Sequence, residues 1–323
     1  MIRVHSSFHS QRNELSLRMT PRLPIILISF LLLQAKATNA ENDSLKKINY
    51  KARKITLGTS AAVVSAGSIA YLNYAWFEPY NTGKFHFFND NKEWNQMDKC
   101  GHAFTCYQTG RLMMDAFDWA GYNKNTKLIV AGGIGLYYMT AIEVMDGFSE
   151  GWGFSAGDIA ANALGAGLAV SQEAAWNEQR ILLKFSYSQS GLAEYDPSLL
   201  GENIYTQVLK DYNGQTYWLS VNPSSFMKKQ NKFTKWLNVA FGYSSYGMLG
   251  GFSNEFAIQD KDGNVYRYDR ERRYYFSLDV DLTRIKTRSK FLKGLFSAFN
   301  VLKFPAPALQ LSKKGARGYW IYM

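Results

Sequence analysis

The first half of the chain alternates long apolar segments with short polar connections. Residues 55–77 form the first apolar run, which follows five basic residues and ends among aromatic ones. This length and these flanks predict a helix that either spans a membrane or is deeply buried in a soluble bundle. Residues 96–119, 128–145 and 155–177 carry further helical patterns, and Ser155 stands where an N-cap would begin the last helix. The pattern predicts about four apolar helices.

Small residues form a stripe along the last of these segments. They recur at four-residue spacing, at Gly157, Ala161, Gly165 and Ala169. A stripe of this kind allows another helix to approach closely. We therefore expect the helices to pack on glycine and alanine faces.

The pattern changes from helical to β-rich after residue 180. The strand-like segments cover residues 181–188, 216–221, 236–248 and 273–285. Residues 261–264 are a candidate hairpin turn, whereas Pro305 and Pro307 are expected to interrupt any strand near them. The predicted fold class is α+β, with an N-terminal bundle of about four apolar helices followed by a C-terminal β-rich region.

Residues 1–40 are predicted to be a secretory signal peptide. The apolar run of residues 23–33 is too short to cross a membrane, and small residues follow it at positions compatible with cleavage. Residues 1–18 are polar, which makes Met19 an alternative start. The predicted organisation is a signal peptide over residues 1–40, a helical domain over 41–178, and a β-rich, aromatic and basic region over 179–323 that faces the envelope.

The charge of the chain indicates an anionic partner. Residues 1–40 hold five basic residues and one acid, so their removal leaves +7 of the formal net charge of +11. A basic exported protein suits membrane lipid or lipopolysaccharide, and we expect no nucleic-acid partner. The basic run Arg284, Lys286, Arg288, Lys290 and Lys293 is a candidate contact with such a surface, the alternative being a solvated turn.

The two cysteines fall in one predicted helix. The Cα atoms of Cys100 and Cys106 would lie about 9 Å apart, beyond the roughly 7 Å reach of a disulfide. We expect free thiols that act as small buried side chains, because no second cysteine pair completes a zinc site.

Seven polar residues interrupt the apolar helices and are candidate site residues. They are Asp98, Lys99, His102, Glu143, Asp146, Asp158 and Asn162. Asp98 and His102 are four residues apart, and so are Asp158 and Asn162, while Glu143 and Asp146 are three apart. This spacing gives each of three helices a polar patch on one face, with Lys99 directed elsewhere. Burial of the three patches against one another is the least costly arrangement.

Three kinds of chemistry are open to such a cluster. Asp98, His102 and Asp158 are candidate ligands of a divalent metal. Asp98, His102, Glu143 and Asp158 are also candidate catalytic groups, as a histidine and carboxylates can act as general acid and base. Lys99, Asp146 and Asn162 are candidate binding residues. The third alternative is a purely structural network, which Tyr107, Arg111 and Asp115 could extend unless Arg111 and Asp115 simply pair with each other.

These residues resemble a known family. The order Asp98-Lys99-x-x-His102, then Glu143, then Phe154-Ser155-x-x-Asp158-x-x-Ala161-Asn162-x-x-Gly165 resembles domain of unknown function 2279, a predicted periplasmic lipoprotein family, over roughly residues 95–175. It is more distantly similar to the VanZ-like membrane proteins. The resemblance implies signature positions and no activity. No cysteine lies near the predicted cleavage site, which departs from the lipoprotein description.

The sequence thus predicts an exported, membrane-associated envelope protein in the periplasm or outer membrane of a Gram-negative bacterium. Its expected function is to bind a lipid or glycan headgroup or to support another envelope protein. The alternative is a metal- or His/Asp-dependent hydrolase or transferase that acts on a lipid-linked phosphate. A porin-like component is a third interpretation, against which the small number of strands argues.

Overall fold

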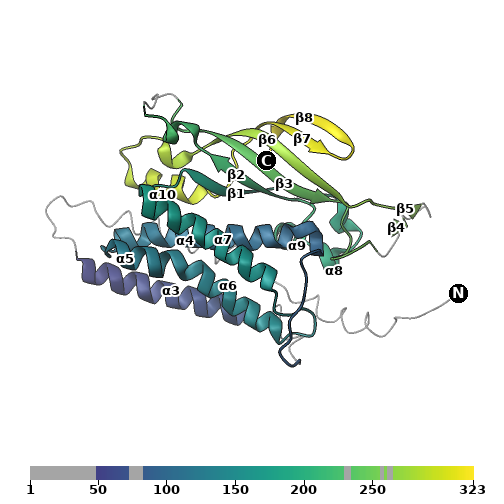
Figure 1. The fold of residues 1–323 in the computed structure, drawn as a ribbon, viewed down its shortest axis with the longest axis horizontal. Coiled ribbons are helices and arrows are strands. Elements are labelled where there is room, and N and C mark those ends of the chain that lie inside the picture. The colour runs from purple at the N-terminus through teal and green to yellow at the C-terminus, as the bar shows by residue number, and fades with distance from the viewer. Residues whose placement is uncertain (1–48, 73–82, 229–233, 255–257, 260–264) are drawn as a thin grey trace.

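The computed structural model describes residues 49–72, 83–228, 234–254, 258–259 and 265–323. Its helices are α3 (Tyr50–Leu72), α4 (Met97–Trp119), α5 (Lys124–Thr126), α6 (Gly132–Gly147), α7 (Ala156–Trp176), α8 (Pro197–Leu200), α9 (Ile204–Lys210) and α10 (Lys290–Phe299). Its strands are β1 (Ile181–Tyr187), β2 (Gln215–Val221), β3 (Leu237–Tyr246), β4 (Ile258–Gln259), β5 (Val265–Tyr266), β6 (Glu271–Val280), β7 (Ala306–Ser312) and β8 (Gly315–Tyr322). A helical layer lies beneath an antiparallel sheet, so the fold is α+β (Figure 1).

The helices α4, α6 and α7 form the centre of the helical layer. Glycine makes their close approach possible, since a Cβ at Gly165 on α7 would clash with the carbonyl oxygen of Ala103 on α4. A Cβ at Gly135 on α6 would lie 2.7 Å from the carbonyl oxygen of Cys106. The small-residue stripe predicted on α7 therefore meets its neighbour at Gly165. Ser155 caps α7 as predicted, because its side chain accepts a hydrogen bond from the N–H of Asp158.

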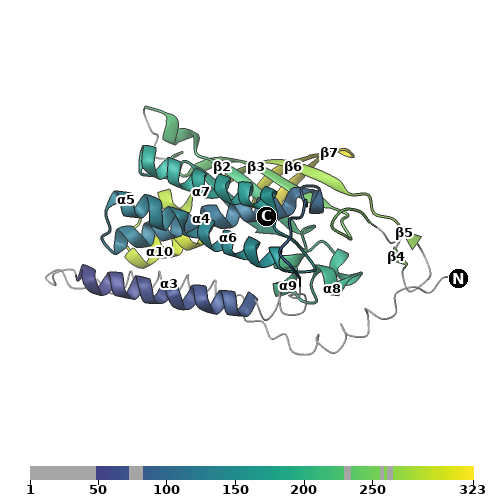
Figure 2. The same ribbon diagram turned by 60° about the horizontal axis from the view of Figure 1, so that its bottom comes forward.

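The helix α3 does not complete a tightly packed bundle of four. It runs along the outside of the helical layer (Figure 2), and none of its described side chains is fully buried. Leu57 and Ala61 contact the core, and the Tyr138 hydroxyl donates to Ser68 at 2.9 Å. The deeply buried alternative for residues 55–77 is therefore not seen over residues 55–72, and residues 73–77 lie outside the described part. The membrane-spanning alternative stays a prediction. Glycine, alanine and serine suit an exposed helix as well as a buried one, so the composition of this segment does not by itself decide its surroundings.

One helical stretch among the described residues, Lys124–Gly147, is long and apolar enough to cross a membrane. Within the most apolar 18 residues of this stretch, 22% of the segment is buried inside the protein. A core helix of a soluble protein can meet the same criterion.

The main sheet has six antiparallel strands in the order β1-β2-β3-β6-β7-β8. The four strand segments expected from the sequence correspond to β1, β2, β3 and β6. Pro307 lies inside β7, contrary to the expectation that it would interrupt a strand. The pairing of β7 with β8 is irregular between Ala306 and Ala308, and such an irregularity tolerates a residue that has no N–H. The hairpin turn expected at residues 261–264 falls outside the described residues.

The two faces of this sheet differ in the polarity of their side chains. One face holds a polar interior in which Lys184 and Asp279 pair at 2.8 Å with no exposure, next to a cluster around Trp218 and Tyr275. The other face carries apolar side chains and packs on α4 at one end, where Phe104 contacts the rings of Phe185 and Tyr217. Farther along that face, neighbouring apolar residues on β2, β3, β6 and β7 are exposed. They are Leu219, Phe241, Phe276 and Leu309.

Candidate functional site

A strained turn positions the first residues of the site. Trp94, Asn95 and Gln96 have φ values of 45°, 51° and 65°, which are left-handed conformations that cost free energy for residues other than glycine. The turn is held in place because the N–H of Trp94 donates to the carbonyl oxygen of Gly251 at 2.7 Å, and the Asn95 amide donates to Ser245 at 2.7 Å. It therefore fixes the direction in which α4 begins, directly before Asp98 and Lys99.

Lys99 lies inside the polar cluster. Its place in the helical pattern predicts instead that its side chain points away from the cluster. Its Nζ atom is 2.7 Å from Asp90, 3.0 Å from Asp158 and 3.4 Å from Asp98. Burial alone would lower the pKa of Lys99, but the carboxylates of Asp90, Asp98 and Asp158 raise it above its ordinary value. The long side chain reaches around the helix, a freedom that spacing along the helix does not capture.

Asp90 is a member of the cluster that the sequence did not reveal. It is buried in the loop before α4 and accepts a hydrogen bond from the Ser155 hydroxyl at 2.6 Å. Burial favours a higher pKa for Asp90, but hydrogen bonds with Asp158, Lys99 and Ser155 outweigh it and lower the pKa below the ordinary value. Ser155 thus links the cap of α7 to the cluster. Asp90 lies in a loop, where no helical or strand periodicity marks a buried side chain. The one signal in the sequence is an acidic residue within an aromatic segment.

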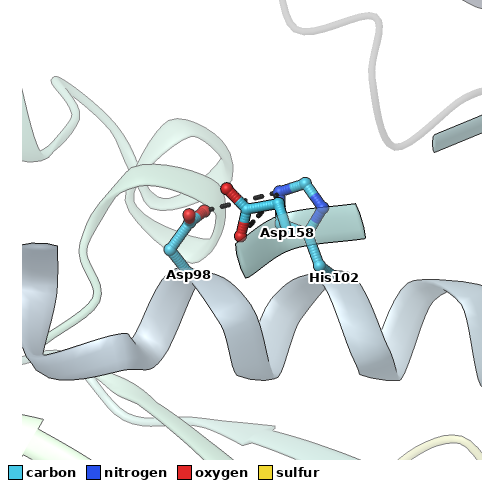
Figure 3. A group of neighbouring side chains, drawn as sticks. All are labelled: Asp98, His102 and Asp158. Atoms are coloured by element: carbon cyan, nitrogen blue, oxygen red, sulfur yellow. Dashed lines mark ion pairs between the residues drawn. The ribbon is translucent and has the colours of Figure 1, made fainter. Parts of the chain in front are cut away.

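His102 stands at the centre of the cluster, with its two ring nitrogens in different surroundings. Its Nδ1 atom is 3.1 Å from Oδ1 of Asn162. Its Nε2 atom faces three carboxylates, at 3.6 Å from Glu143, 3.7 Å from Asp98 and 4.0 Å from Asp158. Figure 3 shows Asp98 and Asp158 directed toward this side of the imidazole ring. All three distances exceed that of a normal hydrogen bond.

Three carboxyl groups of the cluster hold their protons unusually well. Burial raises the pKa of Glu143 to about 8, with the charge of Asp158 adding to it. Burial and the charge of Asp98 likewise raise the pKa of Asp146 to about 7 and that of Asp158 to about 7. Burial and neighbouring carboxylates therefore disfavour the ionised forms of these three groups near neutral pH. Sites of this kind are often functional.

The β-rich region also contributes to the site, which the sequence did not predict. The Tyr212 hydroxyl donates a hydrogen bond to Oδ1 of Asp98 at 3.0 Å. The ring of Tyr212 also contacts that of Trp94. Tyr212 is 114 residues from Asp98 in the chain, so local periodicity could not bring the two together.

The polar side of α4 beyond His102 does not extend the cluster. The Arg111 side chain donates to Gln108 at 2.9 Å and to the backbone and hydroxyl of Ser297, and it lies 3.7 Å from Asp115. Tyr107 donates instead to the carbonyl oxygen of Ile181 at 3.0 Å. Of the two alternatives, the internal pair of Arg111 and Asp115 is the one seen.

The cluster has the composition of a metal site. One ligand atom each from Asp98, His102 and Asp158 can be chosen so that all three lie within 4.8 Å of one another. Carboxylate oxygens with an imidazole nitrogen suit divalent manganese or zinc. The predicted convergence of polar patches from α4, α6 and α7 is confirmed by the contacts of His102 with Glu143 and Asp158.

A comparison with known proteins agrees with the resemblance. The family described as "Predicted periplasmic lipoprotein (DUF2279)" matches residues 86–174. This match supports export to the periplasm. It covers the cluster residues from Asp90 to Asn162, whereas Tyr212 lies outside it. A VanZ-like relationship is not shown. No curated protein and no solved structure matches the chain.

Proposed function

We propose that this protein binds a divalent cation between Asp98, His102 and Asp158, and through it the phosphate of an envelope lipid or glycan headgroup. The single observation that carries the proposal is the arrangement of His102. Asn162 Oδ1 also accepts from the Cys106 thiol at 3.3 Å, as an oxygen and not an amide N–H would. An Nδ1–H of His102 can therefore donate to this oxygen, which leaves Nε2 as the ring nitrogen that faces the carboxylates.

In the neutral ring with its hydrogen on Nδ1, the lone pair of Nε2 would face carboxylate oxygens and be repelled by them. A metal bound to Nε2 would turn that repulsion into coordination. Asn162 would then play the part of the outer partner that fixes the tautomer and direction of a metal-binding histidine.

The balance of charge supports the same conclusion. When the five carboxyl groups of Asp90, Asp98, Glu143, Asp146 and Asp158 are all ionised, their negative charge exceeds the positive charge of Lys99 and a protonated His102. A divalent cation would offset much of this excess. A bound metal would in turn hold a phosphate oxygen, since phosphates bind readily to metals that keep open positions.

Titration of the metal-free protein with Mn²⁺ and Zn²⁺ tests this proposal. After dialysis against EDTA, isothermal titration calorimetry should show one saturable site, and a saturating metal should raise the melting temperature. His102→Gln and Asp98→Asn should weaken binding at least about tenfold, as the loss of a ligand does. His86→Gln is the matched control, because His86 is exposed and hydrogen-bonds Lys84. Equal binding by all four proteins, or none by the wild type, would contradict the proposal.

A hydrolase or transferase is the second candidate function, and Glu143 favours it. A carboxyl group whose pKa is raised to about 8 keeps a proton at neutral pH and can act as a general acid. The Mn²⁺-loaded protein should then release phosphate from a phosphate ester, and Glu143→Gln should abolish release while retaining metal binding. Metal binding without any phosphate release would leave headgroup binding as the function.

A further inference from the structure

The helix α10 turns its apolar side outward. Phe291, Leu295 and Phe299 follow one another at four-residue spacing and so share one side of the helix. Phe291 is 45% exposed and Phe299 is 51% exposed, while Leu292 next to them is 37% exposed. A helix in a water-soluble protein normally buries this side.

The small and polar side of α10 is the side that packs against the protein. Ala298 is buried, and Ser297 receives hydrogen bonds from Arg111 on α4 at 3.2 Å and 3.1 Å. Ser289 caps the helix, since its side chain accepts from the N–H of Leu292. The orientation of α10 is therefore fixed by specific contacts, and its apolar side is held away from the core.

The segments on both sides of α10 also hold exposed apolar residues. Ile285 precedes the helix and is 36% exposed, while Leu302 and Phe304 follow it and are each 47% exposed. We define the α10 surface as the exposed apolar residues of α10 and of the segments directly before and after it. They are Ile285, Phe291, Leu292, Phe299, Leu302 and Phe304.

The charge of the same segment is of one sign. Residues 284–303 contain six basic residues and no acid. Arg284 pairs with Glu178 and Asp281, and Lys303 is buried. Lys286, Arg288 and Lys293 are exposed and lie within a few residues of the apolar side chains along the chain. Positive charge around an apolar helix face is the arrangement by which interfacial helices bind anionic bilayers.

We propose that the α10 surface docks this protein on an anionic phospholipid bilayer, with α10 lying in the plane of the interface. Phe291, Leu292 and Phe299 enter the boundary between headgroups and acyl chains, and Lys286, Arg288 and Lys293 contact lipid phosphates. A protein partner would need acids that match these cations, whereas a bilayer offers apolar and anionic material together. This proposal is independent of the metal site, because α10 contacts the second half of α4, whereas the cluster lies at its beginning.

Sedimentation with vesicles tests the proposal on the full chain. We expect co-sedimentation with phosphatidylcholine vesicles that contain phosphatidylglycerol, and much less with phosphatidylcholine alone. Phe291→Ser with Phe299→Ser should weaken partitioning at least about tenfold, and so should Lys286→Gln with Arg288→Gln and Lys293→Gln. The matched control is Tyr205→Ser with Leu209→Ser, an exposed apolar pair four residues apart on one side of α9. Circular dichroism melts establish that each variant is folded.

The depth of insertion gives a second readout that does not depend on total binding. An environment-sensitive dye attached to Phe291→Cys should shift its emission to the blue on anionic vesicles, and the same dye on Tyr205→Cys should not. Unchanged partitioning of both α10 variants, or the same dye response at the two positions, would overturn the proposal. Self-association through the α10 surface without any binding to vesicles would overturn it as well.

Discussion

The Nδ1 atom of His102 on α4 lies 3.1 Å from Oδ1 of Asn162 on α7. This contact joins two helices and fixes the imidazole so that Nε2 faces Asp98, Glu143 and Asp158. Asn162 has no exposure, so it acts on any bound cation only through the histidine.

Asn162→Leu should therefore weaken metal binding without removing a ligand. We expect the dissociation constant for Mn²⁺ to rise about 10- to 100-fold, the usual effect of losing the outer partner of a metal-binding histidine. Isothermal titration calorimetry measures it. Asn238→Leu is the control, since Asn238 is equally buried in β3 but hydrogen-bonds Ser220 and Asn222. The control should lose stability and keep its metal affinity. The same loss of affinity in both variants would rule out a specific role for Asn162.

Lys99→Met should destabilise the metal-free protein. The ammonium group lies within 3.4 Å of Asp90, Asp98 and Asp158, and its removal leaves these carboxyl groups without their cation. The expected loss is about 3–5 kcal/mol of unfolding free energy at neutral pH. Urea unfolding in EDTA measures it.

Divalent metal should restore more stability to Lys99→Met than it adds to the wild type. The reason is that Lys99 shares Oδ1 of Asp158 with the proposed cation site. Repeating the urea unfolding with saturating Mn²⁺ gives the comparison. A variant that is as unstable with metal as without it would show that the cluster serves only as a structural network.

The cluster should also make stability depend on pH. The pKa of Asp146 rises from an ordinary 3.8 to about 7, through burial and the charges of Asp98 and Asp158. The folded protein thus keeps a proton that the unfolded chain releases, so this contribution to stability is complete below about pH 4 and is lost as pH rises through about 7.

Asp146→Asn removes the titrating group and should reduce that loss. The free energy of unfolding of the variant minus that of the wild type should be more positive at pH 8 than at pH 4.5. Urea unfolding in EDTA measures both. Glu150→Gln, an exposed site nearby, is the control and should follow the wild type. A wild-type stability that rises between these two pH values and is unchanged by Asp146→Asn would contradict the prediction.

Much of the helical layer and most residues of the site could be predicted from the sequence. Asp98 and His102 are four residues apart, and so are Asp158 and Asn162. Residues at this spacing lie on the same face of a helix wherever the helix is in the fold. Ser155 was recognisable because capping is also local. These features need no knowledge of the fold.

The remaining features depend on long-range contacts or on flexible side chains. Tyr212 reaches Asp98 from the β-rich region, and Lys99 folds back toward Asp158 through rotamers that spacing does not fix. The position of α3 also depends on its neighbours, because its glycines and alanines fit either surroundings. The outward side of α10 is the clearest case, since an amphipathic pattern reveals two sides without saying which one the protein buries.

The close packing of α4 on α7 offers a comparison between two glycines of one helix. A Cβ at Gly165 would meet the backbone of Ala103, whereas at Gly167 nothing lies within 4 Å. Gly165→Ala should therefore destabilise the protein by about 1–3 kcal/mol, because the backbone of α4 must shift. Gly167→Ala should stabilise it by about 0.5–1 kcal/mol, since alanine favours a helix interior. Urea unfolding should give opposite signs, and equal effects would show that α4 and α7 are not in contact at Gly165.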